Sequence, residues 1–288
     1  MAPSFIESGF STRVEYEQWL TGTPSGVGSA TGVQPFSKNL TVYYWPMMGR
    51  AGAVMRMLDY AGVPYKHKSE FGEIASVCGA FGAQTTVFAP PVVVDGDYTM
   101  SQSTATAMYV GKKCGLTKGM DEDKALQILA DLIDTFENGI GAAADKGGSS
   151  LKQFFEDGEP SRFAKLMGNI ERNIQGPYFF GASLTVPDFV LAALTDWQDF
   201  TKLEVRINGH EPSGGERRRA LSLLTPLLLF SCGEQRLKKE KGFDPWSGYP
   251  KAAAVVAAVR ALPSYKVNQL QVVRDGFYAK DELFAAYR

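Results

Sequence analysis

A tyrosine hydroxyl beside the start of a helix is the first group in this sequence that could carry chemistry. Tyr44 ends a β-prone segment, and Arg50 follows it where a helical pattern begins. One hydrogen bond to a charged group contributes about 1.5–3 kcal/mol, and lowering a thiol pKa by about 2 units requires about 2.7 kcal/mol. A single hydroxyl, aided by the helix dipole, could therefore hold a bound thiol as its thiolate. A strand tyrosine that faces the core is the alternative interpretation.

Three further groups could bind the rest of a peptide-like ligand. Arg50 carries its charge at the unfavourable end of a helix, so it either orients the tyrosine, binds a carboxylate or is an ordinary surface arginine. Gln102 and Ser103 begin another helix, where backbone N–H groups and polar side chains suit a carboxylate and an ammonium group. Pro90-Pro91 precedes a strand, and a cis bond there would turn the backbone edge of residue 90 toward an extended peptide. A trans Pro-Pro turn is the simpler alternative.

The elements that must position these groups follow from the residue pattern. Alternation predicts a strand over 40–44, and helical spacing predicts a helix over 51–61 that Gly62 ends. A second strand over 63–68 completes a β-α-β unit, whose crossover should be right-handed. Residues 70–89 are glycine-rich and weakly patterned, so we expect a loop there.

The remainder of the pattern predicts a hairpin and then helices only. Residues 92–100 form the hairpin, and Ser101 or Ser103 is expected to cap a helix that runs to about residue 114. Beyond it, apolar residues recur at helical spacing, first in a stripe from Leu126 to Phe136. Residues 185–188 have capping-box spacing, with Asp188 in place of the usual glutamate.

Composition limits the class of protein. The 288 residues allow two domains, and the net charge of −1 gives no general attraction to nucleic acid or anionic lipid. No apolar run reaches the roughly 20 residues that a membrane span needs. The three cysteines, Cys78, Cys114 and Cys232, are far apart, so neither a zinc site nor a disulfide framework is expected. Residues 1–20 lack a signal-peptide pattern, so we expect the cytoplasm, with an organelle left open.

Taken together, these motifs resemble the glutathione transferase superfamily, and in particular its tyrosine-type soluble branch close to the sigma class. The resemblance covers about 39–203 and 248–275. It implies an α/β thioredoxin-like domain over 39–116 and an all-α domain over 121–288 with an insertion at about 203–247. Residues 1–38 would form an extension with a flexible Gly/Ser-rich linker. The family also implies glutathione as co-substrate, no metal and usually a homodimer.

The resemblance assigns roles residue by residue. Tyr44 matches the catalytic tyrosine that binds the glutathione thiolate, and Arg50 matches the arginine beside it. The pair that holds the γ-glutamyl group corresponds to Gln102 and Ser103, and the cis-proline corresponds to Pro91.

Three positions depart from the family pattern. Pro90 lacks the backbone N–H that pairs with the cysteinyl part of glutathione; if Pro90 were itself the cis residue, Ala89 would supply that group. The Trp and Lys that hold the glycyl carboxylate have no clear match, and Gln84 is only a candidate. The acid that reaches across from a partner subunit falls at Glu137 or Asn138.

The leading hypothesis is a glutathione-dependent transferase or isomerase that acts on an apolar electrophile. The alternative is a non-catalytic scaffold or binding subunit of a larger protein assembly, motivated by the extension, the insertion and Pro90. A cysteine-dependent thiol-transfer activity has little support, because no cysteine lies near the helix start at 47–50.

Overall fold

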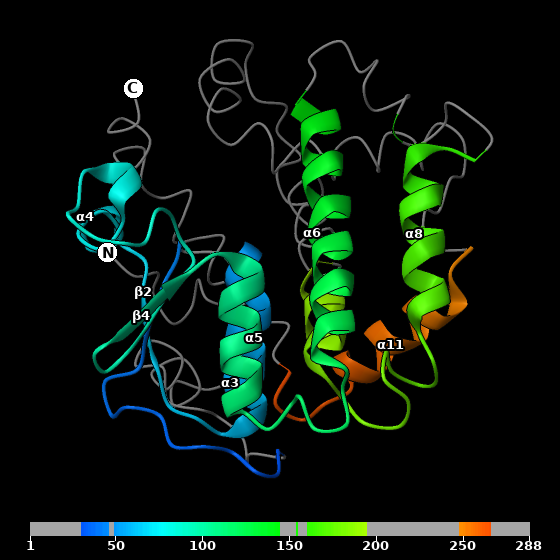
Figure 1. Ribbon diagram of the computed structural model, residues 1–288, viewed down its shortest axis with the longest axis horizontal. Coiled ribbons are helices and arrows are strands. Elements are labelled where there is room, and N and C mark those ends of the chain that lie inside the picture. The colour runs from blue at the N-terminus through cyan, green and yellow to red at the C-terminus, as the bar shows by residue number, and fades with distance from the viewer. Residues whose placement is uncertain (1–29, 46–48, 145–153, 155–159, 195–247, 266–288) are drawn as a thin grey trace, which may run out of the picture.

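The computed structural model describes residues 30–45, 49–144, 154, 160–194 and 248–265, with the backbone alone over 136–144. These residues form two parts that lie side by side (Figure 1). A small sheet with helices makes up the first part, and long helices make up the second. The expected insertion at about 203–247 and residues 1–29 of the expected extension lie outside the described residues.

The sheet has four strands in the order β2-β1-β3-β4. Their bounds are Thr41–Tyr43 for β1, Lys66–Lys68 for β2, Val92–Asp95 for β3 and Tyr98–Ser101 for β4. β1 and β2 are parallel, whereas β3 is antiparallel to both β1 and β4. The predicted β-α-β unit and hairpin are confirmed, but β2 is shorter than the predicted strand over 63–68.

Three helices of this first part pack around its core: η1 (Gly49–Ala51), α3 (Gly52–Ala61) and α5 (Ser103–Lys113). Figure 1 shows α3 and α5 between the sheet and the long helices, and every residue of α3 from 52 to 59 is buried. Gly62 ends α3 with a left-handed backbone at φ 68°, which confirms the predicted stop. Because α3 is central, the residues at its N-terminus are also buried.

The expectation of a loop over 70–89 is partly wrong. This stretch contains α4 (Phe71–Ala75) and the 3-10 turn η2 (Gly79–Phe81). Both enclose a small cluster of Ile74, Cys78, Val87 and Val92, separate from the main core. Helices of five and three residues are too short to show a helical period in sequence, so packing on this cluster rather than local pattern determines them.

The second part contains α6 (Glu122–Ala144), α8 (Arg162–Asn173), a helix over 186–194 and α11 (Pro250–Arg260). The buried face of α6 is formed by Ala125, Ile128, Leu129 and Leu132. Leu126, which the predicted stripe includes, is 42% exposed. Leu129 and Leu132 of the predicted stripe are thus confirmed as buried, whereas Ala125 and Ile128 take the place of Leu126 on the face that packs against α5 and α8.

The two parts meet through close contacts of small and aromatic residues. A Cβ atom built on Gly111 of α5 would lie 2.2 Å from Cγ2 of Val186, so only glycine allows this approach. On α3, the buried Arg56 guanidinium lies 4.0 Å from the centre of the Tyr265 ring, a cation–π contact. In the described parts of the chain, no helix is long and apolar enough to cross a membrane.

The described end of the predicted extension packs on the first part. Ser37 donates its backbone N–H to Asp95 at 2.6 Å, and Lys113 forms an ion pair with the same carboxylate. The Lys113 ammonium also lies 4.4 Å from the centre of the Phe36 ring. Burial alone would raise the pKa of Asp95, but the bonds from Lys113, Ser37 and Tyr109 hold this pKa below its ordinary value. The segment from 30 to 39 is thus tied to the end of α5.

Candidate functional site

Tyr44 follows the last residue of β1 and lies almost entirely inside the protein, with 3% of its surface exposed. Its hydroxyl oxygen accepts the backbone N–H of Arg50 at 3.0 Å. Because a phenol both accepts and donates, this bond directs the hydroxyl proton to another acceptor. The N–H group belongs to η1, which leads into α3, so the hydroxyl lies at the positive end of a helix.

Gly49 makes this arrangement sterically possible. A Cβ atom at this position would lie 2.6 Å from the Tyr44 hydroxyl oxygen and 2.9 Å from the ring carbon Cε1. The backbone of Gly49 also has a φ of 39°, which side chains other than hydrogen disfavour. Sequence spacing gives no sign of this contact, because Gly49 reaches the tyrosine only through the fold.

Gln102 has the one positive φ among the described residues other than glycine, at 77° with ψ 130°. Such a backbone costs of order 1–3 kcal/mol and is concentrated at functional sites. Gln102 is the N-cap of α5 and Ser103 is its first residue, with no side-chain cap bond. The expectation that Ser101 or Ser103 caps this helix is therefore wrong. The Gln102 carbonyl instead accepts the N–H and the hydroxyl of Thr106.

Pro91 is buried directly ahead of β3, and the Pro90–Pro91 peptide bond is cis. Thus Pro91 is the cis residue, which agrees with the position that the resemblance implies. Tyr43 pairs with Val92 in the antiparallel register of β1 and β3. The next residues along these strands, Tyr44 and Pro91, therefore lie beside one another. Pro90 is partly exposed, and being proline it offers no backbone N–H to a ligand.

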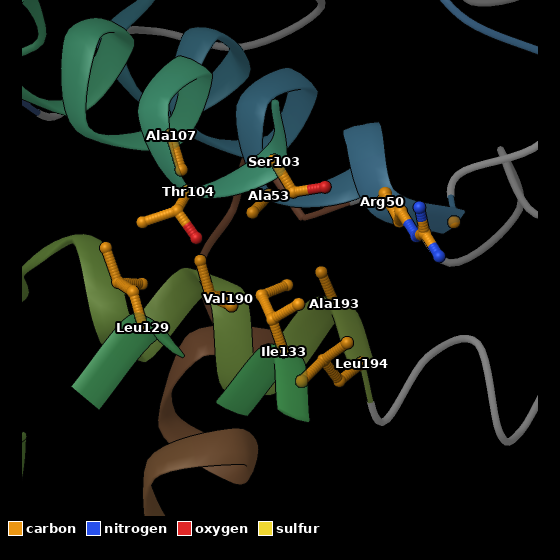
Figure 2. Close-up of a pocket in the computed structure, with 11 residues that line it drawn as sticks. Arg50, Ala53, Ser103, Thr104, Ala107, Leu129, Ile133, Val190, Ala193 and Leu194 are labelled. Atoms are coloured by element: carbon orange, nitrogen blue, oxygen red, sulfur yellow. The ribbon is translucent and has the colours of Figure 1, made fainter. Parts of the chain in front are cut away.

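A small cavity, partly open to solvent, lies between the two parts of the molecule. Arg50 and Ser103 reach it from the sheet side, and Leu129 and Ile133 face it from α6 (Figure 2). The Ser103 hydroxyl points along the upper wall toward Arg50. The full lining comprises Gly49, Arg50, Ala53, Ser103, Thr104, Ala107, Leu129, Ile133, Val190, Ala193 and Leu194. The polar side chains of the lining, Arg50, Ser103 and Thr104, thus lie on one wall beside glycine and alanine, and the opposite wall is apolar.

The structure brings some of the sequence-predicted residues together and leaves others apart. Arg50 and Ser103 share the cavity, and Tyr44 lies behind its Gly49 wall. Gln84 is exposed in the bend after η2, and it is not among the residues that line the cavity. Glu137 and Asn138 lie in the second half of α6, but their side chains fall outside the described portion.

The two described cysteines are buried, and their thiols are unreactive at neutral pH. Burial raises the pKa of Cys114 to about 12 and also raises the pKa of Cys78. A protonated thiol is a poor nucleophile, so neither residue supplies a thiolate at neutral pH. Cys232 lies outside the described residues. Within the described ranges, no group of three or more His, Cys, Asp or Glu side chains could hold a metal ion.

One residue that sequence reasoning passes over lies directly behind the tyrosine. The His67 ring nitrogen Nε2 is 3.1 Å from the backbone oxygen of Tyr44. Burial lowers the pKa of His67, and backbone hydrogen bonds to Tyr44 and Trp45 oppose this effect. The parallel register that pairs Val42 with His67 brings the ring to this place. The sequence signal that could have identified His67 is its place in a predicted strand that pairs with the strand before Tyr44.

Comparison with known proteins gives relatives of one kind. No protein-family model matches the chain. A glutathione S-transferase of Tyrophagus putrescentiae is 27% identical over 159 residues, which are 51% of this chain and 70% of the relative. Glutathione S-transferase P 1 of Xenopus laevis is 25% identical over 157 residues, which are 51% of this chain and 71% of the relative.

A solved structure described as a nematode-specific GST of C. elegans has the same fold. Its TM-score is 0.51 with 15% sequence identity, over 79% of this chain and 93% of that chain. The predicted fold class is confirmed: a thioredoxin-like α/β domain is followed by an all-α domain. The names of the relatives and the shared fold support a relationship to the glutathione S-transferase superfamily.

Proposed function

We propose that this protein is a glutathione-dependent transferase or isomerase of the tyrosine-type, sigma-like branch. The observation that carries the proposal is the Tyr44 hydroxyl, which accepts the Arg50 N–H at 3.0 Å beside the start of α3. Relatives named glutathione S-transferase over half of the chain support glutathione as the co-substrate. We also propose a homodimer that works in the cytoplasm.

In this proposal Tyr44 donates its hydroxyl hydrogen bond to the sulfur of bound glutathione. A bond to an anion contributes about 1.5–3 kcal/mol, and the N-terminus of α3 adds a smaller term of the same sign. Both interactions favour the thiolate over the thiol, so they lower the thiol pKa. Tyrosine suits the role because its own pKa near 10 keeps its proton in place at neutral pH.

The remaining ligand contacts are assigned to residues around the same helix starts. Gln102 and Ser103 would hold the γ-glutamyl group, and the strained backbone of Gln102 is consistent with a binding role. Arg50 would orient the tyrosine or bind a carboxylate of the tripeptide. Pro91 and Pro90 would line the cysteinyl backbone.

Two further contacts complete the proposal. Gln84 remains a candidate for the glycyl end of glutathione. Glu137 or Asn138 would be the contact from a partner subunit.

The second substrate would be an apolar electrophile bound in the cavity. The helical wall there consists of Leu129, Ile133, Val190, Ala193 and Leu194. In the reaction, the thiolate sulfur attacks an electrophilic carbon of this substrate to form a carbon–sulfur bond. A leaving group departs with its electron pair, or an activated double bond opens and then takes up a proton. Exclusion of water by the apolar wall strengthens the charge interactions at the sulfur.

Calorimetric titration of glutathione into the purified full chain tests this proposal. We expect a dissociation constant between micromolar and low millimolar for the wild type. Arg50→Ala and Gln102→Ala should each weaken binding by about five-fold or more, which corresponds to roughly 1 kcal/mol. Arg162→Ala, an exposed arginine at the start of α8, is the matched control and should bind as the wild type does. A wild type with no measurable binding would favour the non-catalytic binding subunit instead.

A further inference from the structure

We propose that His67 is a positioning residue for Tyr44, whose imidazole fixes the backbone of the tyrosine and through it the place of the hydroxyl. This inference rests on the proposed function, because it assigns His67 to the same thiolate site. The contact that carries it is the 3.1 Å approach of Nε2 to the Tyr44 carbonyl oxygen. His67 itself does not touch the substrate, so its action is indirect.

The chemistry of the contact determines which imidazole nitrogen carries the proton. A carbonyl oxygen accepts hydrogen bonds and cannot donate them. The nitrogen that faces it must therefore carry hydrogen, so Nε2–H donates to the Tyr44 carbonyl. The neutral imidazole can do this without carrying a charge at this part-buried position.

Tyr44 is held by β2 through both of its backbone groups. Its N–H donates to the Lys68 carbonyl at 3.1 Å, and its carbonyl accepts from the His67 side chain. The regular ladder of β1 and β2 ends at Tyr43. The imidazole therefore adds a hydrogen bond from β2 to the residue that follows the ladder. These two bonds fix the backbone of Tyr44 directly after the end of the strand. Gly49, five residues later, lies against the hydroxyl of the same tyrosine.

A small backbone rotation matters at this position because the hydroxyl lies at the far end of a long side chain. A tilt of about 10° at the Cα moves the hydroxyl by roughly 1 Å, and displacements of that size can cost about 100-fold in rate. The bond to the Arg50 N–H would lengthen with the same movement. Loss of the His67 contact should therefore weaken the hydrogen bond from the Tyr44 hydroxyl to the sulfur. The affinity for the rest of the ligand should change little.

The surroundings of His67 favour the neutral ring. Burial lowers its pKa, whereas hydrogen bonds to the backbone of Tyr44 and Trp45 and the charge of Glu73 act in the opposite direction. Glu73 is itself paired with Lys68 at 3.0 Å. Burial is the largest of these effects, so the net shift of the pKa is downward and the donor role needs no protonated imidazole.

The test measures the pKa of the glutathione thiol in the complex, from its thiolate absorbance in the ultraviolet as a function of pH. His67→Phe keeps a planar ring but removes the donor, and His67→Gln keeps an N–H donor. His67→Met is a second donor-free variant, used where His67→Phe does not fold. Met167→Ala, a buried change in α8, is the stability control, since such changes cost about 2–5 kcal/mol.

We expect the donor-free variants to raise the bound thiol pKa by about one unit while glutathione affinity changes less than about three-fold. His67→Gln should recover at least half of that shift, and Met167→Ala should leave the thiol pKa unchanged. A donor-free variant with the wild-type thiol pKa, alongside a raised value for Tyr44→Phe, overturns the role of His67 alone. A wild-type complex whose thiol pKa equals that of free glutathione overturns the proposed function and this inference with it.

Discussion

Asp188 offers a quantitative test of what holds the helix over 186–194 in place, and this helix lines the cavity with Val190, Ala193 and Leu194. The side chain is fully buried at the start of the helix over 186–194. Its carboxylate accepts the Phe179 N–H at 2.9 Å, and the N–H and hydroxyl of Thr185 at 2.7 Å each. One group therefore joins the helix start to the turn before it.

Asp188→Ala would leave the N–H groups of Phe179 and Thr185 buried without this acceptor. Each unsatisfied group costs about 1–3 kcal/mol, so the free energy of unfolding should fall by roughly 2–6 kcal/mol. That loss is large against a domain stability of about 5–15 kcal/mol. Asp188→Asn keeps one acceptor oxygen but turns an NH₂ group toward donors, so we expect about half of the loss.

The pH dependence of the same residue has a definite sign. Burial raises the pKa of Asp188 to about 6 in the folded protein, above the ordinary value of 3.8. The folded state therefore binds the proton more tightly than the unfolded state does. The resulting contribution to stability is fully present below about pH 4, and it is lost as the pH rises through about 6. A difference of about two units corresponds to roughly 3 kcal/mol.

Urea denaturation followed by circular dichroism, at pH 4.5 and 7.5 and one protein concentration, measures both effects. The wild type should lose about 2 kcal/mol relative to Asp188→Asn between the lower and the higher pH. Two results would refute the reasoning. One is Asp188→Ala within about 0.5 kcal/mol of wild type at pH 7.5. The other is a wild type that gains stability relative to Asp188→Asn as the pH rises.

Two glycines give further predictions from steric contacts. Gly111→Ala should lower the free energy of unfolding by about 1–3 kcal/mol, because its Cβ would lie 2.2 Å from Val186 Cγ2. Urea denaturation should show that adding Val186→Ala recovers part of this loss. Additive losses in the double variant would contradict the contact. Gly49→Ala should displace the Tyr44 hydroxyl, since its Cβ would lie 2.6 Å from that oxygen. The bound glutathione thiol pKa should then rise by about one unit, and an unchanged thiol pKa would contradict this geometry.

Local signals in the sequence were sufficient for the elements that carry the tyrosine. The strand alternation before Tyr44, the helical spacing that follows and the left-handed stop at Gly62 are each determined by neighbouring residues. The same holds for Asp188, whose contact with Thr185 lies within one helical turn. Such features need no knowledge of the distant chain, so a single sequence predicts them.

Features that depend on distant residues were missed or misplaced. α4 and η2 are held by packing on Val92, which lies well beyond them in the chain. The N-cap at Gln102 takes a strained backbone that no local preference favours. The cavity needs α3 and α5 to lie against α6, and the His67 contact depends on strand register. These arrangements follow from tertiary structure, so residue spacing does not reveal them.

The most direct test of the central claim compares the thiol pKa of bound glutathione in the wild type and in Tyr44→Phe. Phenylalanine keeps the ring that packs on Gly49 and removes the hydroxyl alone. The account predicts a thiol pKa about 2 units below that of free glutathione in the wild type, and its return to near the free value in Tyr44→Phe. An equally lowered thiol pKa in both proteins would contradict the assignment of Tyr44 as the thiolate-stabilising residue.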